Sequence, residues 1–380
     1  FLILIFILYS VNYLIEYFVV YPYTSLLQAD QNQYVFTSYR NVVKIAFGVV
    51  ELLLMRCKVS LILLILLNII FTLFYILRVT SKIKKMYPWL DKEAKPDTSA
   101  FKMTKDVMVH KFSSLVFSKT DPIILSNFSL GYVTLYTSYN YILDFITSIV
   151  SKIFNAIKSS YCNIVALEKK EDKKYYNMFL SFSFFAGTFC ACVFDATVNP
   201  FVKIVWLGKS YFLSTIIVHM FSIIMFGRII INPIYVARDS KGLYKETKGF
   251  TVAQAIVNIV LSLILVQKYK ILGVLIGTVV SQYLVLIPLN VKIVYEKIFN
   301  GDIKIFLKKL CISIISIAIL FFINYKLQVI FSIKTKLDVI IYMLIIAFVD
   351  VIISLIFFTV IDNDFKELVK QIKSKVRRSK

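Results

Sequence analysis

The chain has 380 residues, of which 59% are apolar, 16% aromatic and only 17% charged, and its mean hydropathy is +0.77. Soluble domains are about half apolar and about a quarter charged, so this composition argues against soluble enzymes, disordered chains and secreted disulfide scaffolds. Lys and Arg number 44 against 22 Asp and Glu, a net charge of +22. Because the basic residues lie mostly between apolar runs, we interpret them as membrane-topology signals and not as a nucleic-acid interface.

Apolar runs of spanning length divide the chain from its first residue onward. Phe1 already stands inside such a run with no basic segment before it, so we interpret the run as a span, not a signal peptide, and expect the natural N-terminus to be missing. A span needs roughly 20 apolar residues. In chain order the eleven predicted spans are about 1–21, 41–56, 59–77, 105–126, 131–164, 176–198, 212–236, 250–267, 271–294, 310–325 and 338–361.

The basic residues alternate from loop to loop. With eleven spans, the loops and tail on one side carry 30 of the 44 Lys and Arg, and those on the other side carry nine. Cytoplasmic loops are the basic ones in membrane proteins. The pattern therefore predicts a cytoplasmic C-terminus and an outer-side position for Phe1.

The remaining five basic residues lie at membrane depth: Lys111, Lys119, Lys152, Lys158 and Arg228. Ionisable groups in a span are costly and usually face a cavity or a partner. They predict a water-filled cationic cavity for an anionic substrate; the alternative is that the lysines extend to the headgroups. We favour the headgroups for Lys158 and the cavity for Lys152 and Arg228, and leave both open for Lys111 and Lys119, which lie within about 80° on one helix face.

Polar side chains recur with helical spacing in two spans, either lining the cavity or bonding neighbouring helices. The stripe in 131–164 comprises Asn140, Asp144, Ser148, Ser151, Asn155, Ser159 and Cys162, and the stripe in 250–267 comprises Gln254, Asn258 and Ser262. Three acids, Asp144, Asp195 and Glu16, are expected to pair with cations or, as a second choice, to hold a coupling ion. Gly273 and Gly277 form a G-x-x-x-G pattern that predicts close helix packing.

No motif indicates catalysis, a cofactor or a metal site. The five cysteines form no C-x-x-C pair, and the two histidines, His110 and His219, are far apart. P-loop, G-x-G-x-x-G and G-x-S-x-G patterns are absent. The predicted outer loops of roughly 4 to 14 residues leave no room for an outer catalytic domain. We therefore expect a protein that is not an enzyme.

Five stretches in a fixed order resemble one family, over roughly residues 22–300. They are L-L-Q-A-D-Q-N-Q-Y at 26–34, I-K-K-M-Y-P-W-L at 83–90, K-D-V-M-V-H-K-F-S-S-L-V-F-S-K-T-D-P-I-I-L-S at 105–126, G-L-Y-K-E-T-K-G at 242–249 followed by V-N-I-V-L-S-L-I-L-V at 257–266, and I-L-G-V-L-I-G-T-V-V-S at 271–281. Together these stretches resemble the Wzx-type polysaccharide flippases of the MOP superfamily, which serve O-antigen and capsule synthesis.

The resemblance implies an all-α, MATE-like fold of two six-helix lobes and two extra helices. This chain would lack the first three of fourteen spans. Residues 1–98 would hold the rest of the first lobe and a cytoplasmic linker centred on the polar stretch 82–99, residues 99–298 the second lobe, and residues 299–380 the extra pair and a basic tail.

The resemblance further implies that the protein moves an undecaprenyl-diphosphate-linked oligosaccharide across the bacterial cytoplasmic membrane by alternating access. Its partners would be this lipid-linked oligosaccharide, membrane lipids and a polysaccharide polymerase complex. The family's basic cavity positions match Lys111, Lys119, Lys152 and Arg228. Two alternatives stay open: a MATE-type multidrug exporter, which would use the acids, and a non-transporting scaffold of the assembly complex.

Overall fold

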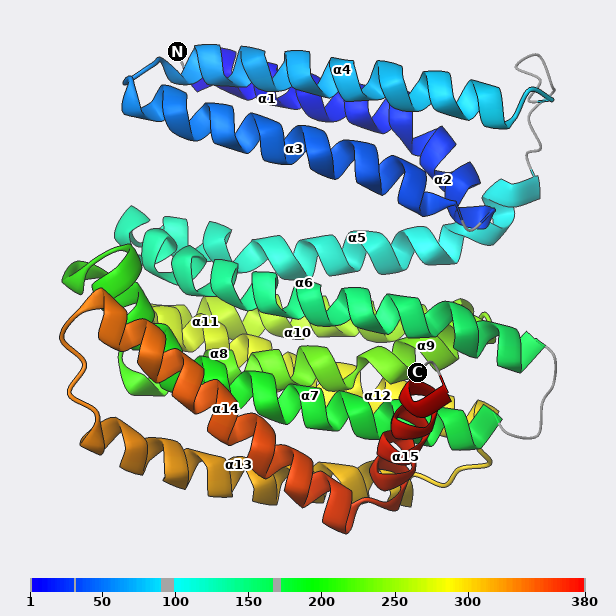
Figure 1. Ribbon diagram of the computed structural model, residues 1–380, viewed down its shortest axis with the longest axis vertical. Helices are drawn as coiled ribbons and strands as arrows, with labels where there is room; N and C mark the ends of the chain where they lie inside the picture. The colour runs from blue at the N-terminus through cyan, green and yellow to red at the C-terminus, as the bar shows by residue number, and fades with distance from the viewer. Residues whose placement is uncertain (1, 31, 90–98, 167–171, 379–380) are drawn as a thin grey trace. The chain divides into compact units, whose positions relative to one another are not determined.

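The computed structural model describes residues 2–30, 32–89, 99–166 and 172–378. All regular elements in these ranges are helices, and eight of the helical segments are long and apolar enough to cross a membrane. The chain is therefore an all-α, multi-pass membrane protein, as its composition predicts. Figure 1 shows the long helices of each part running roughly alongside one another.

The elements follow in chain order. They are α1 (Leu2–Ile15), the π-helical turn η1 (Glu16–Val20), α2 (Tyr21–Ala29), α3 (Gln33–Arg56), α4 (Leu61–Met86), α5 (Ser99–Ser126), α6 (Leu130–Ala166), α7 (Asp172–Pro200), the π-helical turn η2 (Phe201–Trp206), the 3₁₀ turn η3 (Lys209–Tyr211), α8 (Thr215–Ile230), α9 (Asn232–Ser240), α10 (Tyr244–Tyr269), α11 (Ile271–Val280), the π-helical turn η4 (Ser281–Leu286), α12 (Ile287–Ile298), α13 (Lys304–Ile330), α14 (Lys336–Ile361) and α15 (Asn363–Arg378).

The eight apolar spans match eight of the eleven predicted ones. They are Ile3–Leu27, Leu61–Met86, Asp172–Trp206, Thr215–Ser240, Tyr244–Tyr269, Ile271–Ile298, Lys304–Ile330 and Lys336–Ile361. The other three predicted spans are also helical, as α3, α5 and α6, but do not reach the same apolarity. The stretch 82–99 was expected to be a loop, yet α4 continues to Met86, and residues 90–98 lie outside the described part.

The chain forms two compact units, Phe1–Asp97 and Thr98–Lys380. In the first unit, α4 buries Tyr75, Val79 and Ile83 against the neighbouring helices. At the end of α4, the Tyr87 hydroxyl donates a hydrogen bond to Asp30 across 2.5 Å. This hydrogen bond raises the pKa of Tyr87.

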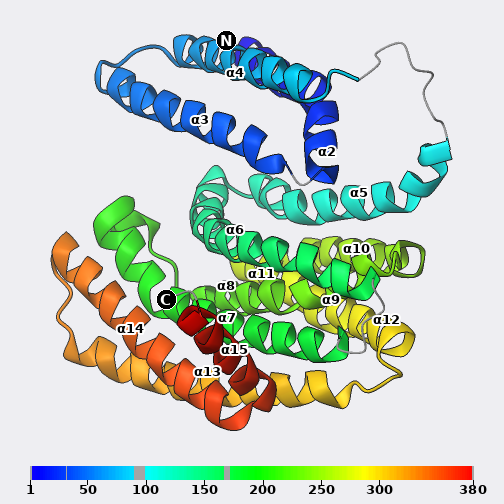
Figure 2. The ribbon, with the colours of Figure 1, turned by 45° about the vertical axis from the view of Figure 1, so that its right-hand side comes forward.

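The second unit is built around α7, which Figures 1 and 2 show among α6, α8, α13 and α14. Within its most apolar window, 72% of the residues of this span are buried, the highest share of the eight spans. Aromatic side chains fill the surroundings of α7, with Phe184, Phe194 and Phe221 fully buried. Most residues of this window are therefore buried against other helices.

Helices α10 and α11 form a tight antiparallel pair joined at Lys270, whose φ is +51°. A Cβ on Gly273 would lie 2.4 Å from the carbonyl oxygen of Leu265, and one on Gly277 would lie 2.5 Å from Oγ of Ser262. The close packing predicted for the G-x-x-x-G pattern is thus confirmed.

Lys309 binds the C-terminal helices to α7. Its ammonium group is buried and donates to Ser181 of α7 at 2.6 Å, to both oxygens of Asp362 at 3.1 Å and to Asp364 at 2.7 Å. The sequence pattern assigned Lys309 to a basic loop, but it lies inside α13. Two carboxylates and a hydroxyl compensate the cost of burying its charge.

The glycine contacts generate a prediction about stability. Gly273→Ala should destabilise the protein by about 1–3 kcal/mol, because the new methyl group meets backbone that cannot move away. Gly249→Ala is the matched control, since its Cβ meets no described atom within 4 Å. The measurement is the temperature at which the detergent-solubilised protein leaves its monodisperse chromatographic peak. Equal midpoints for the two variants would contradict the close packing.

Candidate functional site

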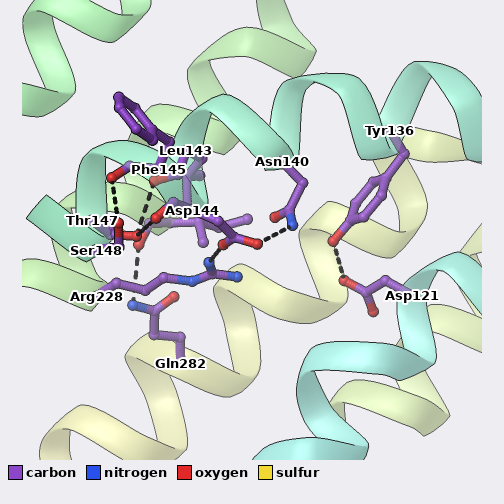
Figure 3. Close-up of polar contacts among 11 residues, drawn as sticks. Asp121, Tyr136, Asn140, Leu143, Asp144, Phe145, Thr147, Ser148, Arg228 and Gln282 are labelled. Carbon is purple, nitrogen blue, oxygen red and sulfur yellow. Dashed lines mark hydrogen bonds and ion pairs between the residues drawn. The ribbon is translucent and has the colours of Figure 1, made fainter. Parts of the chain in front are cut away.

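Arg228 of α8 and Asp144 of α6 form an ion pair, drawn in Figure 3. The distance from Nη1 of Arg228 to Oδ1 of Asp144 is 2.7 Å, and the amide of Asn140 donates to the other Asp144 oxygen at 2.8 Å. The Arg228 side chain is 28% exposed and the Asp144 side chain 55% exposed. The pair is therefore accessible from outside the helix packing.

Close helix packing fixes the position of Arg228. The preceding residue, Gly227, lies against Gln282 of η4, whose amide donates to the Ile224 carbonyl at 3.3 Å. Among the described residues, the guanidinium makes no hydrogen bond except the one to Asp144. An arginine has five N–H donors. Donors thus remain for a further anionic group.

The stripe on α6 lies on the accessible side of its helix. Asn140 and Ser151 are half-buried, while Asp144, Ser148 and Asn155 are exposed. Helix α6 packs through another face, where Tyr139, Leu143 and Phe154 are buried. Helix packing within this unit therefore does not bury the exposed residues of the stripe. The side chains of Ser159, Cys162 and Lys158 lie outside the described part.

Three predicted cavity lysines, Lys111, Lys119 and Lys152, are exposed and do not join the Arg228 pair. No carboxylate in the described part of the chain lies within ion-pair distance of these lysines. Lys111 and Lys119 share the outer face of α5 with exposed Phe112. Within this unit, their charges are therefore uncompensated.

The stripe on α10, for which cavity lining and bonding between helices were both left open, is buried between helices. Gln254, Asn258 and Ser262 are at most 5% exposed. The Asn258 amide donates to the Thr278 hydroxyl at 3.0 Å, and the Ser262 hydroxyl donates to the Val274 carbonyl at 3.4 Å. Hydrogen bonding between helices accounts for the Asn258 and Ser262 contacts.

The same junction contains Asp121, a buried carboxylate of α5. Its Oδ2 accepts hydrogen bonds from Tyr136 of α6 and Thr278 of α11, both at 2.9 Å, and Figure 3 shows the Tyr136 contact. No basic side chain of the described residues lies within 4 Å of it. Nearby, Oδ1 of Asn258 is buried and accepts no hydrogen bond from the described residues. Asp121 therefore joins α5, α6 and α11 through neutral hydroxyl groups.

The other two predicted acids also have partners. Asp195 of α7 accepts from Nδ1 of His219 at 2.7 Å and from Ser222 at 2.9 Å. Glu16 lies in the first unit and binds Arg40 at 3.1 Å and the Tyr75 hydroxyl at 2.7 Å. Asp195, His219 and Asn324 line a polar cavity of about 240 Å³ between α7, α8 and α13.

An apolar cavity lies on the other side of the α6 stripe. Its volume is about 400 Å³, and its lining includes Tyr141 and Phe145 of α6, Val193 of α7, and Trp206 of η2. One face of α6 thus lines an apolar cavity, and the adjacent face carries the polar stripe. The sequence pattern missed this cavity, as it missed Tyr136, Thr278 and Gln282, because its walls come from segments far apart in the chain.

Searches against protein-family models and against curated proteins find no match to this chain.

The ion pair generates a prediction about coupling. Asp144→Ala and Arg228→Ala should each destabilise the protein, and the double variant should lose less than the sum, with a coupling of about 1 kcal/mol for a partly exposed pair. The exchanged variant, Asp144→Arg with Arg228→Asp, should recover part of the stability that the single variants lose. Thermal midpoints in one detergent measure all four variants. Additive losses and no recovery would show that the pair contributes nothing.

Proposed function

We propose that this chain is a MATE-like membrane transporter of eleven spans that flips an undecaprenyl-diphosphate-linked oligosaccharide across the bacterial cytoplasmic membrane. Arg228 is the observation that carries the proposal: a guanidinium at membrane depth, accessible and with free donors, beside an exposed polar stripe. Such groups within a span mark the path of a polar substrate. The product would serve O-antigen or capsule synthesis.

Eight helices are apolar enough to cross a membrane, and the proposal adds three less apolar helices as full spans. The three predicted spans that fall short are α3, α5 and α6, and the last two carry Lys111, Lys119 and Lys152. A helix that lines a water-filled path need not be apolar on that side. In this proposal α5 and α6 are full spans that face the cavity of the second lobe.

The chemistry of the substrate suits the surroundings of α6. A diphosphate needs cationic donors; Arg228 would supply them, with Lys152 farther along α6, and Asp144 would yield the guanidinium to the incoming anion. The lipid chain needs apolar surface, which the cavity beside Tyr141 and Phe145 supplies. Polar and apolar sites on one helix fit a substrate with a charged head and a hydrocarbon tail.

The pairing of the acids argues against the drug-exporter alternative. Asp144, Asp195 and Glu16 each contact a basic or imidazole side chain, so none is left to attract a cationic drug. The scaffold alternative gains from the buried stripe on α10 but not from the exposed stripe on α6.

The decisive experiment replaces the chromosomal gene in the cell that makes the chain. Arg228→Ala and Lys152→Ala should each lower surface polysaccharide at least tenfold, with unchanged protein in the membrane, and should accumulate lipid-linked oligosaccharide on the inner leaflet. Lys326→Ala, an exposed lysine near the end of α13, is the matched control and should be silent.

Normal polysaccharide in both cavity variants would contradict the flippase proposal. If deletion of the gene abolished the polysaccharide while neither variant did, the scaffold alternative would be favoured. Loss of efflux of a cationic dye in Glu16 or Asp195 variants would instead indicate an exporter.

A further inference from the structure

Helix α15 carries two parallel stripes of different chemistry. Phe365, Leu368, Val369 and Ile372 follow the spacing i, i+3, i+4 and i+7, and form an apolar stripe. Lys366, Lys370 and Lys373 follow the spacing i, i+4 and i+7, and form a basic stripe along one flank of it. A basic amphipathic helix of this kind is typical of membrane surfaces.

The helix is held to the second unit by one side only. Phe365 is buried against Phe185 and Phe358, with ring centroids 5.0 and 5.7 Å away. Glu367 binds Lys174 of α7 at 3.3 Å, and Asp364 binds the buried Lys309 at 2.7 Å. Both acidic side chains of α15 are therefore already neutralised.

The three lysines point away from this attachment. Lys366, Lys370 and Lys373 are exposed, and no described carboxylate lies within ion-pair distance of them. Beside them Ile372 is 54% exposed, although it belongs to the apolar stripe. The free face of α15 thus combines three uncompensated charges with an apolar edge.

The place of α15 suits the lipid surface. It begins two residues after α14 ends, and Figures 1 and 2 show it crossing α7 instead of continuing the direction of α14. It lies at the end of the unit where α7 begins with Lys173 and Lys174 and α13 begins with Lys304. Basic ends face the cytoplasmic leaflet, which carries the anionic lipids.

We propose that the free face of α15 binds the anionic headgroups of that leaflet, with Lys366, Lys370 and Lys373 on the phosphates and Ile372 between the upper acyl chains. Each lysine near an anionic surface strengthens such binding about fivefold. The attachment through Lys309 sets the helix at the surface, so the lysines reach the headgroups without a large loss of chain entropy. This proposal does not depend on what the protein transports.

The test uses the full chain in nanodiscs of phosphatidylcholine alone or of equal parts phosphatidylcholine and phosphatidylglycerol. Hydrogen exchange across residues 366–374 should be at least about fivefold slower in the anionic discs. The triple variant Lys366→Gln, Lys370→Gln, Lys373→Gln should lose this difference. The triple variant Lys326→Gln, Lys334→Gln, Lys336→Gln neutralises three exposed lysines around the α13–α14 turn and should keep it.

The same exchange measurement distinguishes anionic lipid from other ligands of the free face of α15. Raising KCl to about 1 M, where charges are screened beyond about 3 Å, should remove most of the difference. Equal exchange in the two kinds of disc, or a full difference in the α15 triple variant, would overturn the proposal. So would protection that inorganic phosphate reproduces in neutral discs, or that follows the number of chains in each disc and not the anionic lipid.

Discussion

Hydrocarbon offers no water for polar groups to bond, and the second unit is arranged around that constraint. Three charged groups withdrawn from the surface there have partners from other helices. Lys309 has two carboxylates and a hydroxyl, Asp195 has an imidazole and a hydroxyl, and Asp121 has two hydroxyls. These contacts join α5, α6 and α11 at one point, α7 and α8 at a second, and α7, α13 and α15 at a third. Polar contacts at these points and the apolar packing between them together hold the helices in place.

Several polar side chains of α5 and α6 are not bonded to other helices in this way. Apart from Asp144, the described side chains of the α6 stripe are not bonded to other helices, and neither are Lys111 and Lys119 of α5, although several of these residues lie in the middle of predicted spans. Arg228 is intermediate, since Asp144 balances its charge while most of its donors stay free. An ion pair that is complete in charge but incomplete in hydrogen bonding is suited to exchange one anion for another.

Periodicity predicts what one helix does but not which helix it meets. The spans and the close contact at Gly273 could be read from local pattern, because both depend on residues a few positions apart. The Arg228–Asp144 pair joins residues 84 apart, and no spacing rule selects it. The stripes on α6 and α10 look alike as sequence, yet Asp144 is exposed and Asn258 is buried, because α11 packs closely over Asn258 through Gly277. The pattern placed Lys309 in a loop because its partners, Ser181, Asp362 and Asp364, all lie more than 50 residues away in the chain.

The bonds made by Lys309 also have a mechanical meaning. A single ammonium group on α13 holds Ser181 of α7, Asp362 after α14 and Asp364 of α15, so four helices share one fixed point near their basic end. Breaking that point would leave the Lys309 ammonium group without its two carboxylate partners, which makes sliding there more costly than sliding between apolar faces. The last two spans, α13 and α14, are therefore expected to move together with α7. Helices α5 and α6 take no part in these bonds, so a movement between them would leave the Lys309 contacts intact.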